Sequence, residues 1–205
     1  MKKAILYIHG KGGNAAEADR FKALCPDYEV LGLDYKGNTP WDTKSEILLE
    51  AQKLLGKYSS VVIIANSIGA YFAMNALRDS PIEKALFISP IVNMERLICD
   101  MMQRANVAED KLKEKDEIPT EFGEVLSYRY LRYVRENQIK WNVPTEILYA
   151  ECDNLTSIDT VTDFAEKHGA GLTIMENGEH WFHTEEQLAF LDQWVKEKIV
   201  DVQDE

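Results

Sequence analysis

The residues with the clearest chemical potential lie where a strand-like run meets a small-x-Ser-x-small pentapeptide. The run 61–64 is β-branched and apolar, Ala65 begins the pentapeptide, Ser67 stands at its centre and Gly69 closes it. A helical pattern starts directly afterwards, so Ser67 is expected at a tight strand-to-helix turn that exposes its Oγ. Larger side chains in place of Ala65 or Gly69 would collide with neighbouring backbone. The amide of Ile68 would lie at a helix N-terminus, where it stabilises a developing oxyanion.

A serine becomes a nucleophile only with a base within hydrogen-bond reach and an acid that orients this base. Asp153 follows the strand-like segment 146–150, and His180 follows the strand-like segment 172–175. The carboxyl ends of parallel strands lie on one edge of a sheet, so three distant side chains can converge there. The sequence therefore predicts a catalytic triad of Ser67, His180 and Asp153.

Other residues compete for the acid and base roles. Glu151 and Asp159 are rival acids, and His183 is a rival base. Asp153 is preferred because its offset past the strand suits a side chain that reaches the histidine loop. His180 is preferred because it directly follows a glycine turn, whereas His183 precedes a helix-capping residue.

The two histidines, His180 and His183, could also form a metal-binding pair. No third ligand is evident nearby in the sequence, and Trp181 and Phe182 between them are typical of packing residues. We therefore expect no metal site.

A second oxyanion donor is available from the glycine-rich loop that follows the strand-like segment Lys3–Ile8. The backbone N–H of Lys11, or that of Gly12, would face the carbonyl oxygen of a substrate. Each such donor is typically worth about 3 kcal/mol of transition-state stabilisation. Gly10, Gly12 and Asn66 are expected to border the bound substrate.

Strand-like and helical segments alternate along the chain, which predicts a mostly parallel sheet with helices on both faces. This is an α/β fold, a three-layer sandwich with about six strands. The expected strands cover Lys3–Ile8, Tyr28–Leu33, 61–66, 85–88, 146–150 and 172–175. The expected helices cover 15–24 with Asn14 as cap, 43–55, 68–78, Ile158–His168 and a last helix that a capping box begins at Thr184.

One region interrupts this alternation within an otherwise single domain, 1–205. Segment 91–142 holds no convincing strand, is longer than a βα crossover needs, and is expected to be helical over 121–137. An insertion near the carboxyl ends of strands is where a helical lid or cap would lie. Its Arg129 and Arg132 would either bind an anionic substrate or form a solvated face. An exposed apolar face on the insertion would support a homodimer.

Composition restricts the class of partner. The 205 residues carry a formal net charge of −12, which argues against nucleic acid or an anionic membrane as the main partner. Three widely spaced cysteines form no disulfide or metal pattern, which is typical of a reducing compartment. No segment is long and apolar enough for a signal peptide or a membrane span. The sequence thus predicts a cytoplasmic protein.

With its His-Gly loop at 9–10, its Ser67 turn, its Asp153 loop and its His180 loop, the chain resembles small α/β-hydrolases. The resemblance covers nearly the whole chain except 91–142. It implies a serine hydrolase that cleaves an ester or related acyl bond of a small-molecule substrate through an acyl-enzyme, without metal or organic cofactor. Two departures are Ala65, where these proteins usually have glycine, and the lack of their first two antiparallel strands.

Two other functions fit parts of the sequence. Gly10, Gly12 and Ala15 match a G-x-G-x-x-A dinucleotide fingerprint, with Asp34 at the end of the next strand as the ribose-binding acid. This would make the chain an NAD(P)-binding protein, but His9 before the first glycine fits the hydrolase loop better. The remaining alternative is a catalytically idle hydrolase fold that serves as a binding module.

Overall fold

The structure is a computed structural model of the chain that describes residues 2–199, so residues 1 and 200–205 of the predicted domain lie outside it. The chain forms two compact units. The larger comprises the described residues of Met1–Val92 and Lys140–Glu205, and the smaller comprises Asn93–Ile139.

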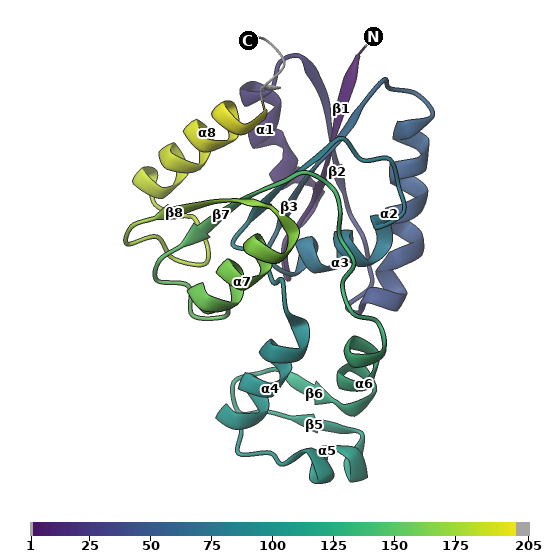
Figure 1. Cartoon of the computed structure of the whole chain (residues 1–205), viewed down its shortest axis with the longest axis vertical. Coiled ribbons are helices and arrows are strands. Elements are labelled where there is room, and N and C mark those ends of the chain that lie inside the picture. The colour runs from purple at the N-terminus through teal and green to yellow at the C-terminus, as the bar shows by residue number, and fades with distance from the viewer. Residues whose placement is uncertain (1, 200–205) are drawn as a thin grey trace. The chain divides into compact units, whose positions relative to one another are not determined.

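The larger unit is built around a six-stranded sheet in the order β2-β1-β3-β4-β7-β8 (Figure 1). All its strand pairs are parallel. The predicted parallel sheet is confirmed, and its strand boundaries differ from the expected ones by at most one residue. The strands are β1 (Lys3–Ile8), β2 (Tyr28–Leu33), β3 (Val61–Asn66), β4 (Lys84–Ile88), β7 (Thr145–Ala150) and β8 (Gly171–Met175).

Helices cover both faces of this sheet, which explains why its central strands are continuous apolar runs. On one face α1 (Asp19–Leu24) and α8 (Glu185–Ile199) contact each other and share a buried cluster with the strands. Among the described residues, the other helices contribute no side chain to that cluster. Of these, α2 (Pro40–Leu55) and α3 (Ile68–Leu77) pack together, and α7 (Ile158–His168) contacts β7 and β8. The predicted three-layer sandwich is thus present.

Helix boundaries follow the capping residues. The helix expected over 43–55 begins earlier, because Thr39 accepts a hydrogen bond from the amide of Asp42 and a proline occupies the first turn. The helix expected over 15–24 divides into a 3-10 turn, η1 (Ala15–Ala18), and α1. The predicted capping box of α8 is confirmed by the Gln187 amide, which donates to Thr184 Oγ1 at 3.2 Å.

The smaller unit contains three helices and a short antiparallel pair of strands. Its elements are α4 (Met94–Arg104), α5 (Glu109–Lys115), β5 (Glu117–Pro119), β6 (Val125–Ser127) and α6 (Tyr128–Glu136). The expectation that segment 91–142 holds no strand was therefore wrong, and the helix expected over 121–137 is only α6.

The turn between β5 and β6 gives the physical reason for that difference. Gly123 has a φ of 85°, which ends any helix there. Thr120 and Glu124 close the hairpin, with the Thr120 amide donating to the Glu124 carbonyl at 2.7 Å. Ser127 then caps α6 by accepting a hydrogen bond from the Tyr130 amide. The lid role of this segment stays a prediction.

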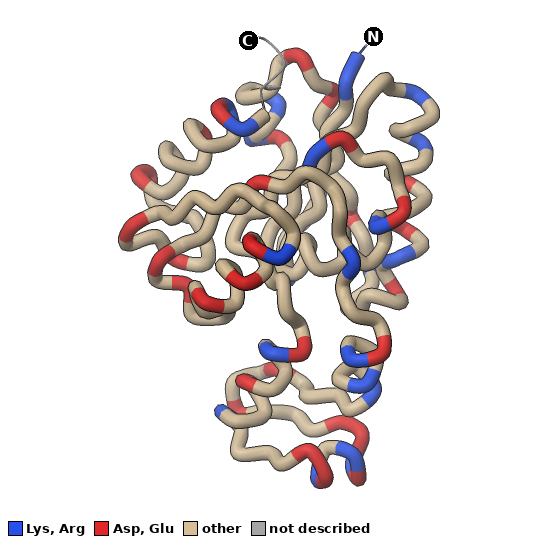
Figure 2. The backbone as a smooth tube through the Cα atoms, in the orientation of Figure 1, with Lys and Arg blue, Asp and Glu red and all other residues tan. Residues whose placement is uncertain are grey.

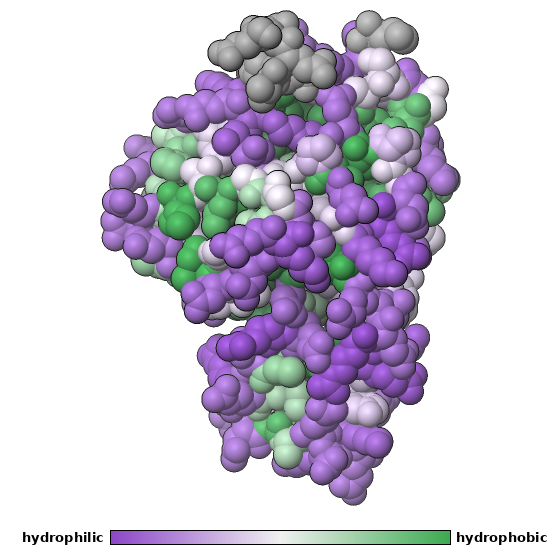
Figure 3. Space-filling model, in the orientation of Figure 1, coloured by the Kyte–Doolittle hydropathy of each residue, from purple (hydrophilic) through white to green (hydrophobic). Residues whose placement is uncertain are grey.

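Charged residues are distributed along both units, with Asp and Glu interspersed among Lys and Arg (Figure 2). Most of the surface visible in Figure 3 is hydrophilic, with hydrophobic patches over the region of β7 and β8. Ile174 in the edge strand β8 contributes to the exposed apolar surface. Within residues 2–199 no helix is both long and apolar enough to cross a bilayer.

Candidate active site

Ser67 occupies the turn between β3 and α3 in a strained backbone conformation. Its φ of 52° and ψ of −122° lie outside the regions that non-glycine residues normally adopt. Two neighbouring segments hold it there, because its N–H donates to the Ile88 carbonyl at 2.9 Å and its carbonyl accepts from the Ile91 amide at 3.1 Å. Strain maintained by the surrounding structure in this way is typical of a functional turn.

Gly69 makes the sharp turn sterically feasible. A Cβ built on this residue would meet the carbonyl oxygens of Ile8 and His9, the former at 2.5 Å. Only a residue without a side chain lets the first turn of α3 approach the end of β1 so closely. The same packing places Ile68, the first residue of α3, where backbone N–H groups have no acceptor within the helix.

The structure brings the three predicted triad residues into one hydrogen-bonded chain. His180 Nε2 lies 2.9 Å from Ser67 Oγ, and His180 Nδ1 lies 2.6 Å from Asp153 Oδ2. A carboxylate can only accept, so Nδ1 carries the ring proton and Nε2 is left as the acceptor for the serine hydroxyl. This arrangement orients a base toward a potential nucleophile.

Asp153 is held by its own loop. Its Oδ1 accepts hydrogen bonds from the amides of Leu155 (2.7 Å) and Thr156 (3.1 Å), and its side chain is fully buried. The rival acids lie elsewhere: Glu151 is exposed and accepts from the Asn177 amide, and Asp159 is exposed on the first turn of α7. Only Asp153 of these three carboxylates contacts the imidazole.

The loop of His180 is joined directly to the acid loop. The Cys152 amide donates to the Gly178 carbonyl at 2.8 Å, which fixes the spacing between the two loops. His183, the rival base, is exposed, and its Nδ1 lies 2.8 Å from the Trp181 carbonyl oxygen. Phe182 is buried as expected, but Trp181 is 70% exposed, so the prediction that it packs was wrong.

The glycine-rich loop lies against the serine turn. A Cβ on Gly10 would stand 3.2 Å from the Cβ of Ser67 and 3.8 Å from Nδ2 of Asn66. Lys11 follows directly, and Gly12 has a φ of 76°, so the chain reverses here. The predicted donors Lys11 and Ile68 thus belong to two backbone segments that meet at Ser67.

Two predicted substrate-binding residues belong to the other unit. Arg129 and Arg132 lie on α6, and Arg132 pairs with Glu136 at 3.6 Å. Their role in binding an anionic substrate therefore stays a prediction.

The end of the glycine-rich loop is poorly suited to a pyrophosphate. A four-residue 3-10 turn follows it, and the Asn14 amide donates to Oε1 of Glu17 at 3.2 Å. The carboxylate thus occupies an N–H group that a phosphate would need, and it would repel an anion. Among residues 2–199 there is also no group of three side chains that could hold a metal ion.

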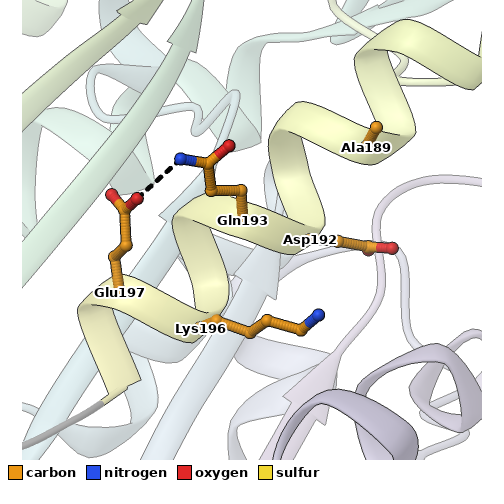
Figure 4. A pocket seen from close by; sticks show the side chains of 5 residues that line it. All are labelled: Ala189, Asp192, Gln193, Lys196 and Glu197. Atoms are coloured by element: carbon orange, nitrogen blue, oxygen red, sulfur yellow. Dashed lines mark hydrogen bonds between the residues drawn. The ribbon is translucent and has the colours of Figure 1, made fainter.

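A surface hollow on α8 is distinct from the triad. It is lined by Ala189, Asp192, Gln193, Lys196 and Glu197, and Figure 4 shows Gln193 donating to Glu197 (2.8 Å) along the helix surface. Asp192 also pairs with Arg20 at 2.7 Å. None of the three triad residues lines this hollow.

No protein-family model matches the chain, and no curated protein matches its sequence. Solved structures do resemble it. Est1E from Butyrivibrio proteoclasticus superposes with a TM-score of 0.73 at 19% identity, covering 97% of this chain and 86% of that chain. Mouse alpha/beta hydrolase domain-containing protein 10 superposes with a TM-score of 0.71 at 15% identity, covering 96% of this chain and 89% of that chain. A lipase-esterase related protein from Clostridium acetobutylicum superposes with a TM-score of 0.64 at 18% identity, covering 96% of this chain and 93% of that chain. The chain has the α/β-hydrolase fold.

Proposed function

We propose that this protein is a serine hydrolase that cleaves an ester or related acyl bond through the triad Ser67, His180 and Asp153. The observation that supports this most is the hydrogen-bonded chain from Ser67 Oγ through the imidazole to a buried carboxylate. The strained turn at Ser67 adds to it, because strain of this kind is retained at functional positions.

In the proposed reaction Ser67 Oγ attacks the substrate carbonyl carbon while His180 Nε2 takes its proton. The oxyanion that forms accepts hydrogen bonds from the Ile68 and Lys11 amides. The tetrahedral intermediate then collapses, and the leaving group departs with the proton from His180. A water molecule, deprotonated by the same nitrogen, attacks the acyl-enzyme and releases the acid and free Ser67. Asp153 holds the imidazole tautomer and stabilises its charged form.

The comparisons suggest where a substrate search should begin. Est1E has been solved with ferulic acid bound, and a thioesterase domain from the curacin biosynthetic pathway shares the fold at a TM-score of 0.60. A panel of p-nitrophenyl acyl esters, a feruloyl ester and an acyl thioester would therefore cover the neighbouring chemistries. Fold alone does not choose among them.

The deciding experiment is the intact mass of the protein after incubation with a fluorophosphonate, followed by peptide mapping. We expect one adduct on Ser67 in the wild type, none in Ser67→Ala, and one in the control Ser45→Ala, whose serine is exposed on α2. Absence of an adduct on folded wild-type protein, or an adduct that persists in Ser67→Ala, would refute the proposal. Thermal stabilisation by NAD or NADP would then support the alternative of an NAD(P)-binding protein. If neither nucleotide stabilises the protein, the alternative of a catalytically idle hydrolase fold is supported.

A further inference from the structure

A polar contact that the proposed reaction does not use lies behind the glycine-rich loop. The Tyr7 hydroxyl donates to Oε2 of Glu17 at 2.6 Å, and the other oxygen of that carboxylate accepts from the Asn14 amide at 3.2 Å. Tyr7 is on β1 and is only 3% exposed. One carboxylate therefore links the strand before the glycine-rich loop to the last residue of that loop.

The same phenol also reaches the strand that precedes the nucleophile. Tyr7 pairs with Ile64 in the register of β1 and β3, and Asn66 lies two residues further along β3, so its side chain points to the same face. The Asn66 side chain offsets part of the rise in the pKa of the Tyr7 phenol, as a nearby N–H donor would.

The loop above this contact is closely packed. A Cβ on Gly13 would collide with the Glu17 carboxylate and stand 3.0 Å from the Cβ of His9. His9 in turn stacks on Tyr35 with ring centroids 4.2 Å apart, and the Tyr35 hydroxyl donates to the His9 carbonyl at 2.8 Å. Both ends of the loop are thus fixed by buried tyrosines.

The Tyr7 phenol stays protonated. Burial is the largest cause that raises the pKa of its phenol far above the usual range, followed by the hydrogen bond to Glu17. The phenol therefore remains a hydrogen-bond donor at every pH at which the protein would work.

We propose that Tyr7 and Glu17 are positioning residues that hold the glycine-rich loop, residues 9–14, against the serine turn so that the Lys11 amide faces the oxyanion. Neither residue touches the reacting atoms. This inference rests on the proposed function, since it assigns a role in the same oxyanion site.

The expected effect is on turnover rather than on substrate binding, because an oxyanion donor acts mainly in the transition state. Complete loss of one such donor costs about 10²–10³ in kcat. Loosening the loop displaces the donor without removing it, so we expect kcat to fall by about 10- to 100-fold with little change in KM.

The test uses Tyr7→Phe and Glu17→Gln in the full chain, with p-nitrophenyl acetate as the substrate and a fluorophosphonate as the probe. Glu17→Gln can still accept from the Asn14 amide, but it presents an NH₂ donor to Tyr7. The matched control is Tyr28→Phe, which removes a partly buried hydroxyl that donates to the Ile199 carbonyl at 3.3 Å, at the amino end of β2. Melting temperatures are measured for all variants.

We expect both variants to lose kcat and the rate of fluorophosphonate labelling together, with KM retained. Tyr28→Phe should keep wild-type rates even if its melting temperature falls equally, which separates positioning from general stability. Wild-type kcat and labelling in Tyr7→Phe and Glu17→Gln would overturn the inference. If Tyr7→Phe fails to fold, Glu17→Gln still tests the inference, because Glu17 is exposed. Wild-type protein that does not label at all would instead refute the proposed function.

Discussion

Replacing Asp153 with Asn isolates the role of the buried carboxylate, because the structure dictates how the new amide must sit. Oδ1 of Asp153 accepts from two backbone N–H groups, those of Leu155 and Thr156. An N–H group cannot accept, so the amide oxygen of Asn must occupy this position and its NH₂ must face His180. The opposite orientation would place the NH₂ group against both N–H donors and remove the acceptor that they now share.

The consequence for the imidazole is a change of tautomer. The NH₂ would stand where Oδ2 now lies 2.6 Å from Nδ1 of His180, so Nδ1 must accept and Nε2 must carry the proton. A protonated Nε2 cannot take the proton of Ser67. The corresponding change in serine-triad enzymes lowers kcat by about 10⁴, which is a transition-state loss of about 5.4 kcal/mol at 1.36 kcal/mol per tenfold.

The assay is the hydrolysis of p-nitrophenyl acetate under saturating conditions, with the melting temperature as a check that the nearly isosteric variant folds. Glu151→Gln is the matched control, since this exposed carboxylate contacts the Asn177 amide and not His180. We expect wild-type rates for the control. An Asp153→Asn variant within tenfold of the wild type would refute the tautomer reasoning, and an inactive Glu151→Gln would assign the acid role to Glu151.

Three further outcomes are expected. Gly69→Ala should lower the free energy of unfolding in urea by about 1–3 kcal/mol, since its Cβ would collide with two backbone carbonyls; an unchanged value would contradict the packing. Cys152, which is exposed, should react with a thiol reagent at pH 8 in the native state, whereas burial raises the pKa of Cys25 to about 11 and should block it until unfolding. Equal reaction rates would be inconsistent with this. Arg135→Gln should cost about 0.2–1 kcal/mol at pH 7. Arg135 holds the pKa of Glu109 below its usual range, so that stabilisation is present above an unfolded-state pKa of about 4.3 and is lost as pH falls through the folded-state value. A stability difference between Arg135→Gln and the wild type that persists in acid would contradict the role of the ionised Glu109.

The sheet could be predicted closely from the sequence because its central strands β1, β3, β4 and β7 are buried on both faces. Such strands appear as uninterrupted apolar runs, and each ends at a polar or glycine-rich segment that marks its carboxyl end. The same ends carry Ser67, Asp153 and His180, so the order of the motifs along the chain was sufficient to anticipate which side chains would meet.

The parts that were missed depend on contacts that no periodic pattern reveals. β5 and β6 have three residues each, which is too short for an alternation to be recognised. The Tyr7 contact with Glu17 depends on where a 3-10 turn packs against β1. Trp181 and Phe182 are neighbours of similar character, yet the loop buries one and exposes the other. In the sequence, only the position of these two residues beside His180 indicated that they differ from other aromatic residues.

The chain order of the candidate triad has a consequence for biosynthesis. Ser67 and His180 are 113 residues apart, a stretch that takes on the order of 6–23 s to translate at about 5–20 residues per second. During that interval a nascent chain carries the serine without its base. Any product truncated before β8 would also lack the base, even if β1, β3 and β4 had already paired. Hydrolytic activity would therefore report the completed polypeptide, and an emerging chain would be protected from premature acylation.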